Sequence, residues 1–488
     1  MGNSETQTAE IQNKMENKTP LTENGMSTND TTLDYCVDLF FSIGAMRGKS
    51  KVRLIEKFSK AYTENPLVAT KILFWVRDVR QGAGERQIFR DVISHLVKLE
   101  PQVVSKNSHL ISEYGRWDDV FTLIGTSLES IAIDLIITAL NTEDGLCAKW
   151  MPRKGLVFNK VRKSLGVTPK QLRKMLVGLT NVVETKMCAK EWDKIEYSKL
   201  PSLASSRYQK SFWKNDSERY SKFVEDLKNG VTTVNSGALY PYDILKSLYA
   251  GGDETVSQKQ WESLPNFMEG NEEKVLPMVD VSGSMDCPAG NNSNLTCMDV
   301  AISLGIYISE RNEGTFKDAF LTFSSNPQLQ FLAGGSLKDK LQQLRSAEWG
   351  MNTNIVATFD LLLNQAVTHN IPQEEMPTKI LILSDMEFDC ATATRSWSNN
   401  EIPEWNPTAM EMIKSKYEKV GYKLPTVVFW NLNARTNNFP VRHNEMNTAL
   451  ISGFSPSILK SVLNGENLTP YSVMMKTVDS DRYESITV

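Results

Sequence analysis

The stretch Val275-Leu-Pro-Met-Val-Asp-Val-Ser-Gly-Ser284 decides the fold of the second half of the chain. A run of apolar residues ends at Asp280, and two serines follow at alternate positions. A short apolar run of this kind is typical of a buried strand, and open α/β sheets bind ligands at the carboxyl ends of their strands. We therefore expect Val275–Val281 to be a first strand with a site at its end.

The residues that follow repeat an alternation of apolar strands and helices, which predicts a doubly wound α/β domain over residues 275–488. The expected strands are Val275–Val281, Ala319–Ser324, Lys379–Ser384, Thr426–Leu432 and Thr448–Gly453. The expected helices are Met298–Arg311, Ser336–Arg345, Ile355–Val367, Pro407–Val420 and Pro456–Leu463.

Three loops of this domain offer oxygen ligands for a divalent cation. Two of them follow expected strands, and the third precedes an expected helix. Hydroxyl and carboxylate oxygens are hard donors, which suits Mg²⁺ or Mn²⁺ and disfavours zinc. The neighbouring acids Glu387 and Asp389 are expected to support the site or to be solvated, rather than to bind the ion. The predicted metal-binding residues are Asp280, Ser282, Ser284, Thr353 and Asp385.

Residues 31–250 show apolar positions at helical spacing, which predicts an all-α, HEAT-like helical array. One helix has clear signals: Thr168 as N-cap, Pro169 at the first position, and an apolar stripe. That stripe consists of Leu172, Met175, Leu176, Leu179 and Val183. Residues 1–30 are polar and predict a disordered tail, and the polar, acidic residues 251–274 predict a linker.

The two halves differ in charge. Residues 31–250 contain 34 Lys and Arg against 24 Asp and Glu, whereas residues 276–488 contain 16 against 23. No acid occurs between Gly145 and Val183, where basic residues are densest. Lys170, Arg173 and Lys174 share one helix face, apart from the apolar stripe. The candidate nucleic-acid-binding residues are Lys149, Arg153, Lys154, Lys160, Arg162, Lys163, Lys170, Arg173 and Lys174.

Such a basic cluster favours a phosphate backbone as its ligand, and Trp150 and Phe158 lie close enough in sequence to stack on unpaired bases. The alternative is a solvated basic face that the acidic domain neutralises. Both aromatic residues are also ordinary core residues. Charge alone does not decide between these two interpretations.

The metal-site residues, in their order and spacing, resemble the metal-ion-dependent adhesion site of von Willebrand factor A domains. The resemblance covers about residues 275–488. It implies that Ser282, Ser284 and Thr353 bind the metal directly, while Asp280 and Asp385 act mostly through bound waters. It also implies that a carboxylate from a partner protein completes the coordination.

A helical module followed by such a domain resembles the TROVE-module proteins, the Ro ribonucleoproteins. The segments Leu73–Arg80, Gly82–Arg86, Tyr114–Asp119, Lys149–Arg153, Leu200–Ala204 and Ser384–Asp389 more closely resemble an uncharacterised Ro-like family. The resemblance to Ro implies a ring of helical repeats that binds small structured RNAs or RNA ends. The basic cluster itself is inferred from charge, not from that resemblance.

Other classes of function find little support in the sequence. The four histidines form no general-base or metal pattern, and no nucleophile motif occurs, so we expect no enzymatic activity. The six cysteines form no CxxC pair, and we expect free thiols, although Cys287 and Cys297 flank one loop and can pair under oxidising conditions. No secretion signal or membrane span is evident, which indicates a cytoplasmic, intracellular protein.

The leading hypothesis is therefore an RNA-binding, Ro-like protein whose α/β domain docks a protein partner through Mg²⁺. The first alternative is an assembly module that binds a partner carboxylate through the metal and needs no RNA. The second alternative is an accessory subunit of an ATPase or nuclease.

Overall fold

The structure, a computed structural model, describes residues 20–290, 295–322, 327–346, 354–388, 408–463, 465 and 467–488. The first half is helical, as expected. Its helices are α2 (Tyr35–Ile43), α3 (Lys51–Glu64), α4 (Pro66–Arg77), α5 (Arg86–Leu99), α6 (Pro101–Lys106), α7 (Ile111–Tyr114), α8 (Trp117–Val120), α9 (Glu129–Asn141), α10 (Gly145–Trp150), α11 (Leu156–Ser164), α12 (Pro169–Leu179), α13 (Val183–Cys188), α14 (Ser202–Asn215), α15 (Ser217–Lys228), α16 (Pro241–Tyr249) and α17 (Glu254–Glu262).

The second half is an α/β domain. Its strands are β1 (Val275–Val279), β2 (Ala319–Thr322), β3 (Leu329–Phe331), β4 (Lys379–Ser384), β5 (Thr426–Asn431) and β6 (Thr448–Ser452). Its helices are α18 (Cys297–Arg311), α19 (Leu337–Ser346), α20 (Ile355–Thr368), α21 (Ala409–Val420), α22 (Leu459–Val462) and α23 (Pro470–Val478). The five expected strands are confirmed: Lys379–Ser384 has the expected ends, three others end one or two residues earlier, and the expected end of Ala319–Ser324 lies outside the described residues. The strand β3 and the helix α23 are additions to the expectation.

The strand order is β3-β2-β1-β4-β5-β6, and every neighbouring pair is parallel except β2 and β3. This order reverses direction between β1 and β4, where Val279 lies opposite Leu383. Doubly wound sheets bind their ligands at such a reversal, beyond the carboxyl ends of the strands. The topology therefore places the residues after β1 and β4 at the favoured position for a site.

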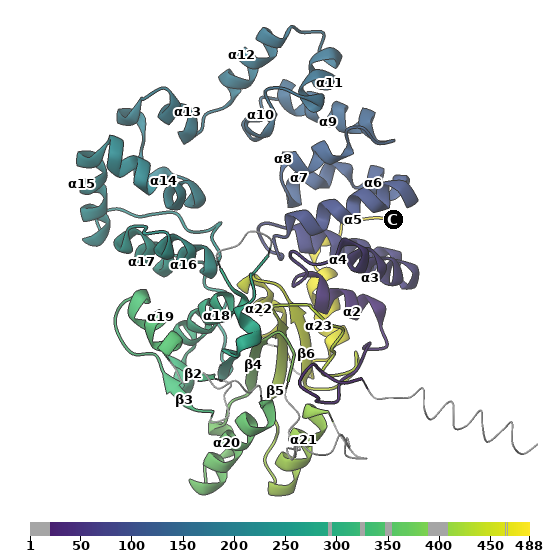
Figure 1. The fold of residues 1–488 in the computed structure, drawn as a ribbon, viewed down its shortest axis with the longest axis vertical. Helices are drawn as coiled ribbons and strands as arrows, with labels where there is room; N and C mark the ends of the chain where they lie inside the picture. Colours follow the sequence, from purple (N-terminus) through teal and green to yellow (C-terminus); the bar gives the residue numbers. More distant parts are fainter. Residues whose placement is uncertain are drawn as a thin grey trace, which may run out of the picture.

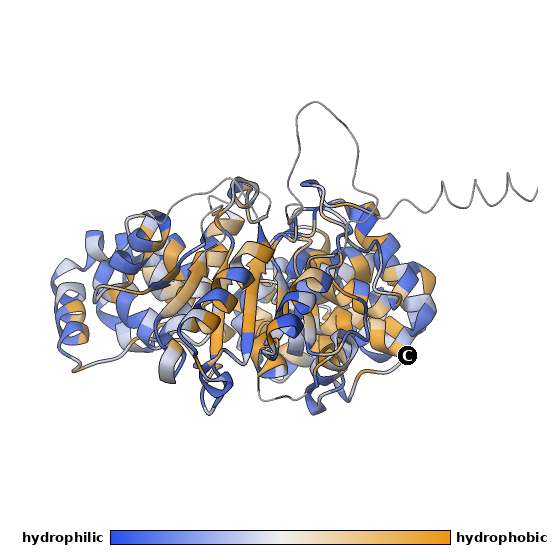
Figure 2. Cartoon of the chain, turned by 90° about the horizontal axis from the view of Figure 1, so that it is seen from below, coloured by the Kyte–Doolittle hydropathy of each residue, from blue (hydrophilic) through white to orange (hydrophobic). Residues whose placement is uncertain are grey.

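The sheet is the apolar centre of this domain. Every residue of β1, β2, β4 and β6 is buried. Figure 2 shows the strands as mostly hydrophobic and the surrounding helices as hydrophilic on their outer sides. Strands buried on both faces read as continuous apolar runs, which is why they were recognisable in the sequence.

The helices of the first half form an arch, and both ends of this arch contact the α/β domain (Figure 1). The arch rises from α2, passes α11 and α12 at its far end, and returns to α17. At one end α2 packs against β6, and at the other α16 packs against α18. Arch and α/β domain together form a closed ring of elements.

The best-bounded helix of the sequence is confirmed in part. Thr168 and Gln171 form a capping box at the start of α12, and Pro169 is its first residue. Leu172 and Leu176 are fully buried. The expected apolar stripe is too long by one residue, because α12 ends at Leu179 and Val183 is the first residue of α13.

Residues 1–19 of the expected tail lie outside the described residues, and the structure differs from the expectation for residues 20–30 and for the linker. Residues 20–30 lie along the α/β domain: the Thr22 hydroxyl donates to the Phe388 carbonyl at 2.6 Å, and Met26 is buried. Hydrogen bonds to a neighbouring backbone order this polar segment, where apolar burial alone would not. Residues 251–274 contain α17, whose Trp261 is buried against the α/β domain.

Two of the sequence segments that carry the Ro-like resemblance form the joint between the halves. Asp78 accepts hydrogen bonds from the Arg482 Nη2 at 2.9 Å and the Tyr483 hydroxyl at 3.0 Å. Behind it, Arg77 forms an ion pair with Asp119 at 2.6 Å, with both side chains almost completely buried. These residues therefore have a structural role. In the described part of the chain, no helix is both long and apolar enough to cross a membrane.

Candidate metal site and basic surface

The first part of the candidate metal site is the loop that follows β1. The Asp280 side chain is fully buried. Its Oδ1 accepts a hydrogen bond from the Ser282 amide at 2.9 Å, and its Oδ2 accepts one from the Ser384 hydroxyl at 2.6 Å. The hydroxyl oxygens of Ser282 and Ser284 lie 3.0 Å apart. One short loop thus holds a carboxylate and two hydroxyl groups in place.

The second part is Asp385, the first residue after β4. Its side chain is completely buried, and its Oδ1 accepts a hydrogen bond from the Glu387 amide at 3.3 Å. Its Oδ2 has no hydrogen-bond partner among the described residues, although the Arg435 Nη2 lies 3.2 Å away. Burial, and then the nearby charge of Asp280, raise the pKa of Asp385 to about 6.

These four residues fit a hard divalent cation. Burial of two neighbouring carboxylates is unfavourable without positive charge between them, and Asp385 presents a buried oxygen without a hydrogen bond. The donors that converge are all oxygens, which Mg²⁺ and Mn²⁺ prefer. The structure thus brings together Asp280, Ser282, Ser284 and Asp385. The fifth predicted ligand, Thr353, lies outside the described residues.

The loop after β5 contributes residues that the sequence interpretation missed. The Arg435 Nη2 lies 3.0 Å from the Glu23 Oε2 as well as 3.2 Å from Asp385. Glu387 is fully buried and accepts hydrogen bonds from the Asn438 Nδ2 and the Glu23 amide, both at 2.9 Å. Glu387 is therefore a supporting residue and is not solvated, while Asp389 lies outside the described residues. The position of this loop beside β4 was the available signal.

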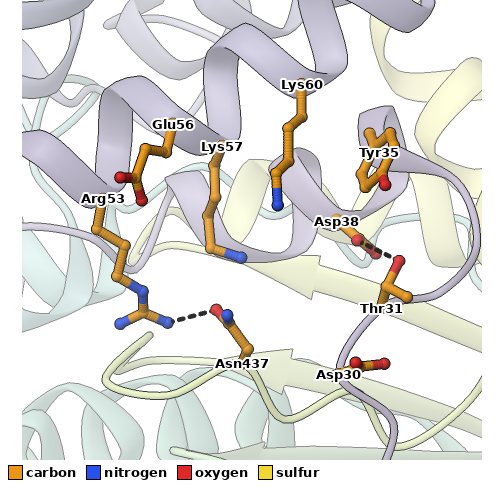
Figure 3. Close-up of a pocket in the computed structure, with 9 residues that line it drawn as sticks. All are labelled: Asp30, Thr31, Tyr35, Asp38, Arg53, Glu56, Lys57, Lys60 and Asn437. Carbon is orange, nitrogen blue, oxygen red and sulfur yellow. Dashed lines mark hydrogen bonds between the residues drawn. The ribbon is translucent and has the colours of Figure 1, made fainter.

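Helix α3 holds the same loop from the other side. The Arg53 guanidinium donates to the Ala434 carbonyl at 2.9 Å, to the Arg435 and Thr436 carbonyls, and to the Asn437 Oδ1 at 2.8 Å. Beside this contact is a cavity of about 280 Å³ between α3, the N-terminal segment and Asn437 (Figure 3). The helical module thereby positions the loop that reaches the candidate metal site.

Lys57 lines this cavity as a poorly compensated cation. Its ammonium has no hydrogen bond or ion pair among the described residues, and it lies 5.2 Å from the centre of the Phe439 ring. The two Asp38 oxygens are already bonded by Thr31 and Thr32. Burial lowers the pKa of Lys57 to about 8.

We expect Lys57→Met to raise the free energy of unfolding by about 1 kcal/mol at pH 7, because it removes a desolvated charge. The folded pKa is about 8 and the unfolded pKa is about 10.4. At a pH between these two values, Lys57 is protonated in the unfolded chain and neutral in the folded protein, so the free energy of unfolding of the parent rises with pH. The difference in stability between the variant and the parent therefore becomes smaller. Urea unfolding at pH 7 and pH 10 measures this. If Lys57→Met is no more stable than the parent at pH 7, or if the difference is the same at pH 10, Lys57 is not a desolvated cation.

The nine predicted basic residues lie on α10, α11, α12 and the turn after α10, at the far end of the arch (Figure 1). Four of them are exposed and have no hydrogen bond or ion pair among the described residues: Lys154, Lys163, Lys170 and Lys174. Others have structural partners. Lys160 pairs with Glu129 at 2.6 Å, and the Arg153 guanidinium donates to the Met151 carbonyl at 2.7 Å. The exposed lysines therefore form the free part of the basic surface.

The two aromatic residues near this surface differ in exposure. Phe158 is buried at 2% exposure, with the Arg173 guanidinium 5.3 Å from its ring centre. It is a core residue and does not present a face for stacking. Trp150 is partly exposed, and the Arg116 guanidinium lies 5.1 Å from its ring centre. Only Trp150 of this pair keeps surface toward solvent.

Comparison with known proteins gives two family matches and one relative. A domain of unknown function, DUF2828, matches residues 22–130 and 130–275, and a second, DUF7788, matches residues 274–485. The matches to the two families meet at the start of β1. The chain is also similar to the uncharacterized protein L728 of Acanthamoeba polyphaga mimivirus, with 28% identity over 519 residues, covering 94% of this chain and 87% of the relative.

Proposed function

The chain belongs to the DUF2828 family, a domain of unknown function, and from its geometry we propose that it is an RNA-binding protein that docks a protein partner through a divalent cation. The convergence of Asp280, Ser282, Ser284 and Asp385 on one buried point carries the docking part of the proposal. The exposed lysines of α11, α12 and the preceding turn carry the RNA part. The proposed role is binding, without a catalytic step.

The docking domain is proposed to be of the von Willebrand A type. Its strand order and the short antiparallel edge strand β3 support this, as does the position of the acids after β1 and β4. Mg²⁺ or Mn²⁺ bound there supplies positive charge for a carboxylate of the partner. Ser282, Ser284 and Thr353 are the proposed direct ligands, with Asp280 and Asp385 holding metal-bound water.

The RNA-binding part is proposed to resemble the Ro ribonucleoproteins. Those proteins contain a ring of helical repeats, and the ring that the helices of this chain form together with the α/β domain in Figure 1 supports the likeness. Lys154, Lys163, Lys170 and Lys174 are the proposed phosphate contacts. Small structured RNAs and single-stranded ends are the proposed ligands, in an intracellular setting.

Reversing the four exposed lysines to glutamate is expected to weaken RNA binding at least 100-fold at 0.1 M salt. Each lost phosphate contact also removes about 0.7 from the slope of log affinity against log salt for single strands, so the slope should fall by about 3. Fluorescence anisotropy with a labelled 20-nucleotide single strand and with a small hairpin measures both quantities.

The matched control reverses Lys210, Lys214, Lys222 and Lys228, which are exposed on α14 and α15. This control changes net charge similarly but leaves the basic surface intact. If it weakens binding as much as the test variant, the attraction is unspecific. If the parent protein binds neither RNA at 50 mM salt, the RNA part of the proposal is wrong.

The second candidate is a protein-assembly module that needs no RNA. The metal-site geometry favours it equally, because that geometry does not involve the basic surface. It predicts that partner capture survives ribonuclease and the lysine variants, and is lost in EDTA and in Asp280→Asn. An accessory role beside an ATPase or nuclease is a special case of this candidate and predicts hydrolysis only in the captured complex.

A further inference from the structure

Two cysteines face each other at the base of the loop that follows the candidate metal residues. The sulfur atoms of Cys287 and Cys297 lie 3.5 Å apart. The Cys297 amide donates to the Cys287 carbonyl at 2.9 Å, and Pro288 and Thr296 form an antiparallel bridge. The backbone therefore holds the two side chains on opposite arms of a narrow hairpin.

The two thiols have unequal surroundings. Cys287 is partly exposed, and its sulfur accepts a hydrogen bond from the Asn433 Nδ2 at 3.0 Å. The hydrogen bond between the two thiols lowers the pKa of Cys287 to about 7, against the opposing effect of burial. Cys297 is buried, with 2% exposure, and its pKa is raised. An accessible thiolate beside a buried second thiol is the arrangement of a redox-sensitive pair.

We propose that Cys287 and Cys297 form a reversible oxidation site, in which Cys287 reacts with a hydroperoxide and Cys297 resolves the product to an intramolecular disulfide. This proposal rests on the hairpin geometry and does not depend on the proposed function. The other described cysteines lack the arrangement, since Cys36 and Cys147 are buried with raised pKa values and Cys188 is exposed on α13.

The chemistry balances with hydrogen peroxide as oxidant. The Cys287 thiolate attacks one peroxide oxygen, an S–O bond forms, the O–O bond breaks, and hydroxide leaves and takes up a proton. The Cys297 sulfur then attacks the Cys287 sulfur, an S–S bond forms, the S–O bond breaks, and water leaves with the Cys297 proton. Two thiols and one peroxide give one disulfide and two waters. The sulfurs must approach by about 1.5 Å to reach bonding distance.

Oxidation would close a covalent ring from Cys287 to Cys297. That ring begins three residues after Ser284 and ends within the first turn of α18. A cross-link restricts the loop it closes, and the restriction also applies to the unfolded chain. We therefore expect the oxidised protein to have a higher Tm than the reduced protein.

The test treats the full-length, reduced protein with a small excess of hydrogen peroxide and then counts thiols after denaturation. The chain has six cysteines, so the count is expected to fall from six to four, with a mass loss of about 2 Da and full recovery in dithiothreitol. Peptide mapping should place the disulfide between Cys287 and Cys297. The product should run as a monomer on a non-reducing gel.

Serine variants separate the two roles. Cys297→Ser is expected to stop at a sulfenic acid on Cys287, about 16 Da heavier and trapped by dimedone. Cys287→Ser should retain its remaining five thiols under the same treatment, while the control Cys188→Ser should still lose two. The proposal is overturned if the parent keeps six thiols, or if Cys287→Ser loses two thiols as fast as the parent.

Discussion

Replacing Asp280 with asparagine is expected to weaken Mn²⁺ binding by about 10- to 100-fold, the range found when an outer ligand of a metal site is lost. Asparagine keeps the shape of the side chain, but its oxygen is uncharged and can no longer orient metal-bound water as a carboxylate does. Titration of Mn²⁺ followed by electron paramagnetic resonance measures the free ion directly. The same variant should lose metal-dependent capture of a partner protein.

Thermal unfolding shows whether the loss is specific to the metal. In EDTA the variant should melt at or above the Tm of the parent, because one of two buried charges, Asp280 and Asp385, is gone. In Mg²⁺ only the parent should gain stability, since the ion binds the folded state. Asp360→Asn, which removes a surface partner of Lys416, is the matched control and should behave as the parent. Equal Mn²⁺ affinities in parent and Asp280→Asn would remove the basis of the metal site.

Asp119→Ala should lower the free energy of unfolding of the helical module by about 3–5 kcal/mol, the usual cost of leaving one partner of a buried ion pair alone. Arg77, with 1% of its side chain exposed, would keep its charge without a counterion. The change also removes two hydrogen bonds that Asp119 accepts, one from the Arg90 Nε at 2.6 Å and one from the Arg116 amide at 3.0 Å. Urea unfolding followed by far-ultraviolet circular dichroism measures the loss.

The neighbouring Asp118 provides the control. Its carboxylate pairs with the Arg90 Nη2 at 2.7 Å, but with 18% of its side chain exposed, so Asp118→Ala should cost less than about 1 kcal/mol. Similar losses in the two variants would mean that the Arg77–Asp119 pair contributes no more than a surface pair.

The α/β domain was largely predictable because its strands are buried on both faces. Continuous apolar runs such as Lys379–Ser384 have no competing interpretation once turns and helices alternate with them. The helix ends were predictable where a cap exists, as at Thr168. The edge strand β3 was missed since it is short, and two of its three residues are exposed.

The candidate site was predictable only as far as its residues are close in sequence or follow strands. Asp280, Ser282, Ser284 and Asp385 meet because β1 and β4 are neighbours, which the expected topology already required. Glu23 and Arg435 come from a segment interpreted as a tail and from a loop without a motif. Their pairing depends on tertiary contacts that no local pattern encodes.

The hydrogen bond between Thr22 and Phe388 spans 366 positions of the chain and has a consequence for biosynthesis. At about 5–20 residues per second, a ribosome needs roughly 20 to 70 seconds to make that intervening stretch. The partner of helix α2 is synthesised later still, since it is Ser452 of β6 whose hydroxyl donates to the Phe40 carbonyl. During this time the apolar face of α2 has no cover from β6. The emerging helical module therefore exposes this apolar face until the last strand has left the ribosome.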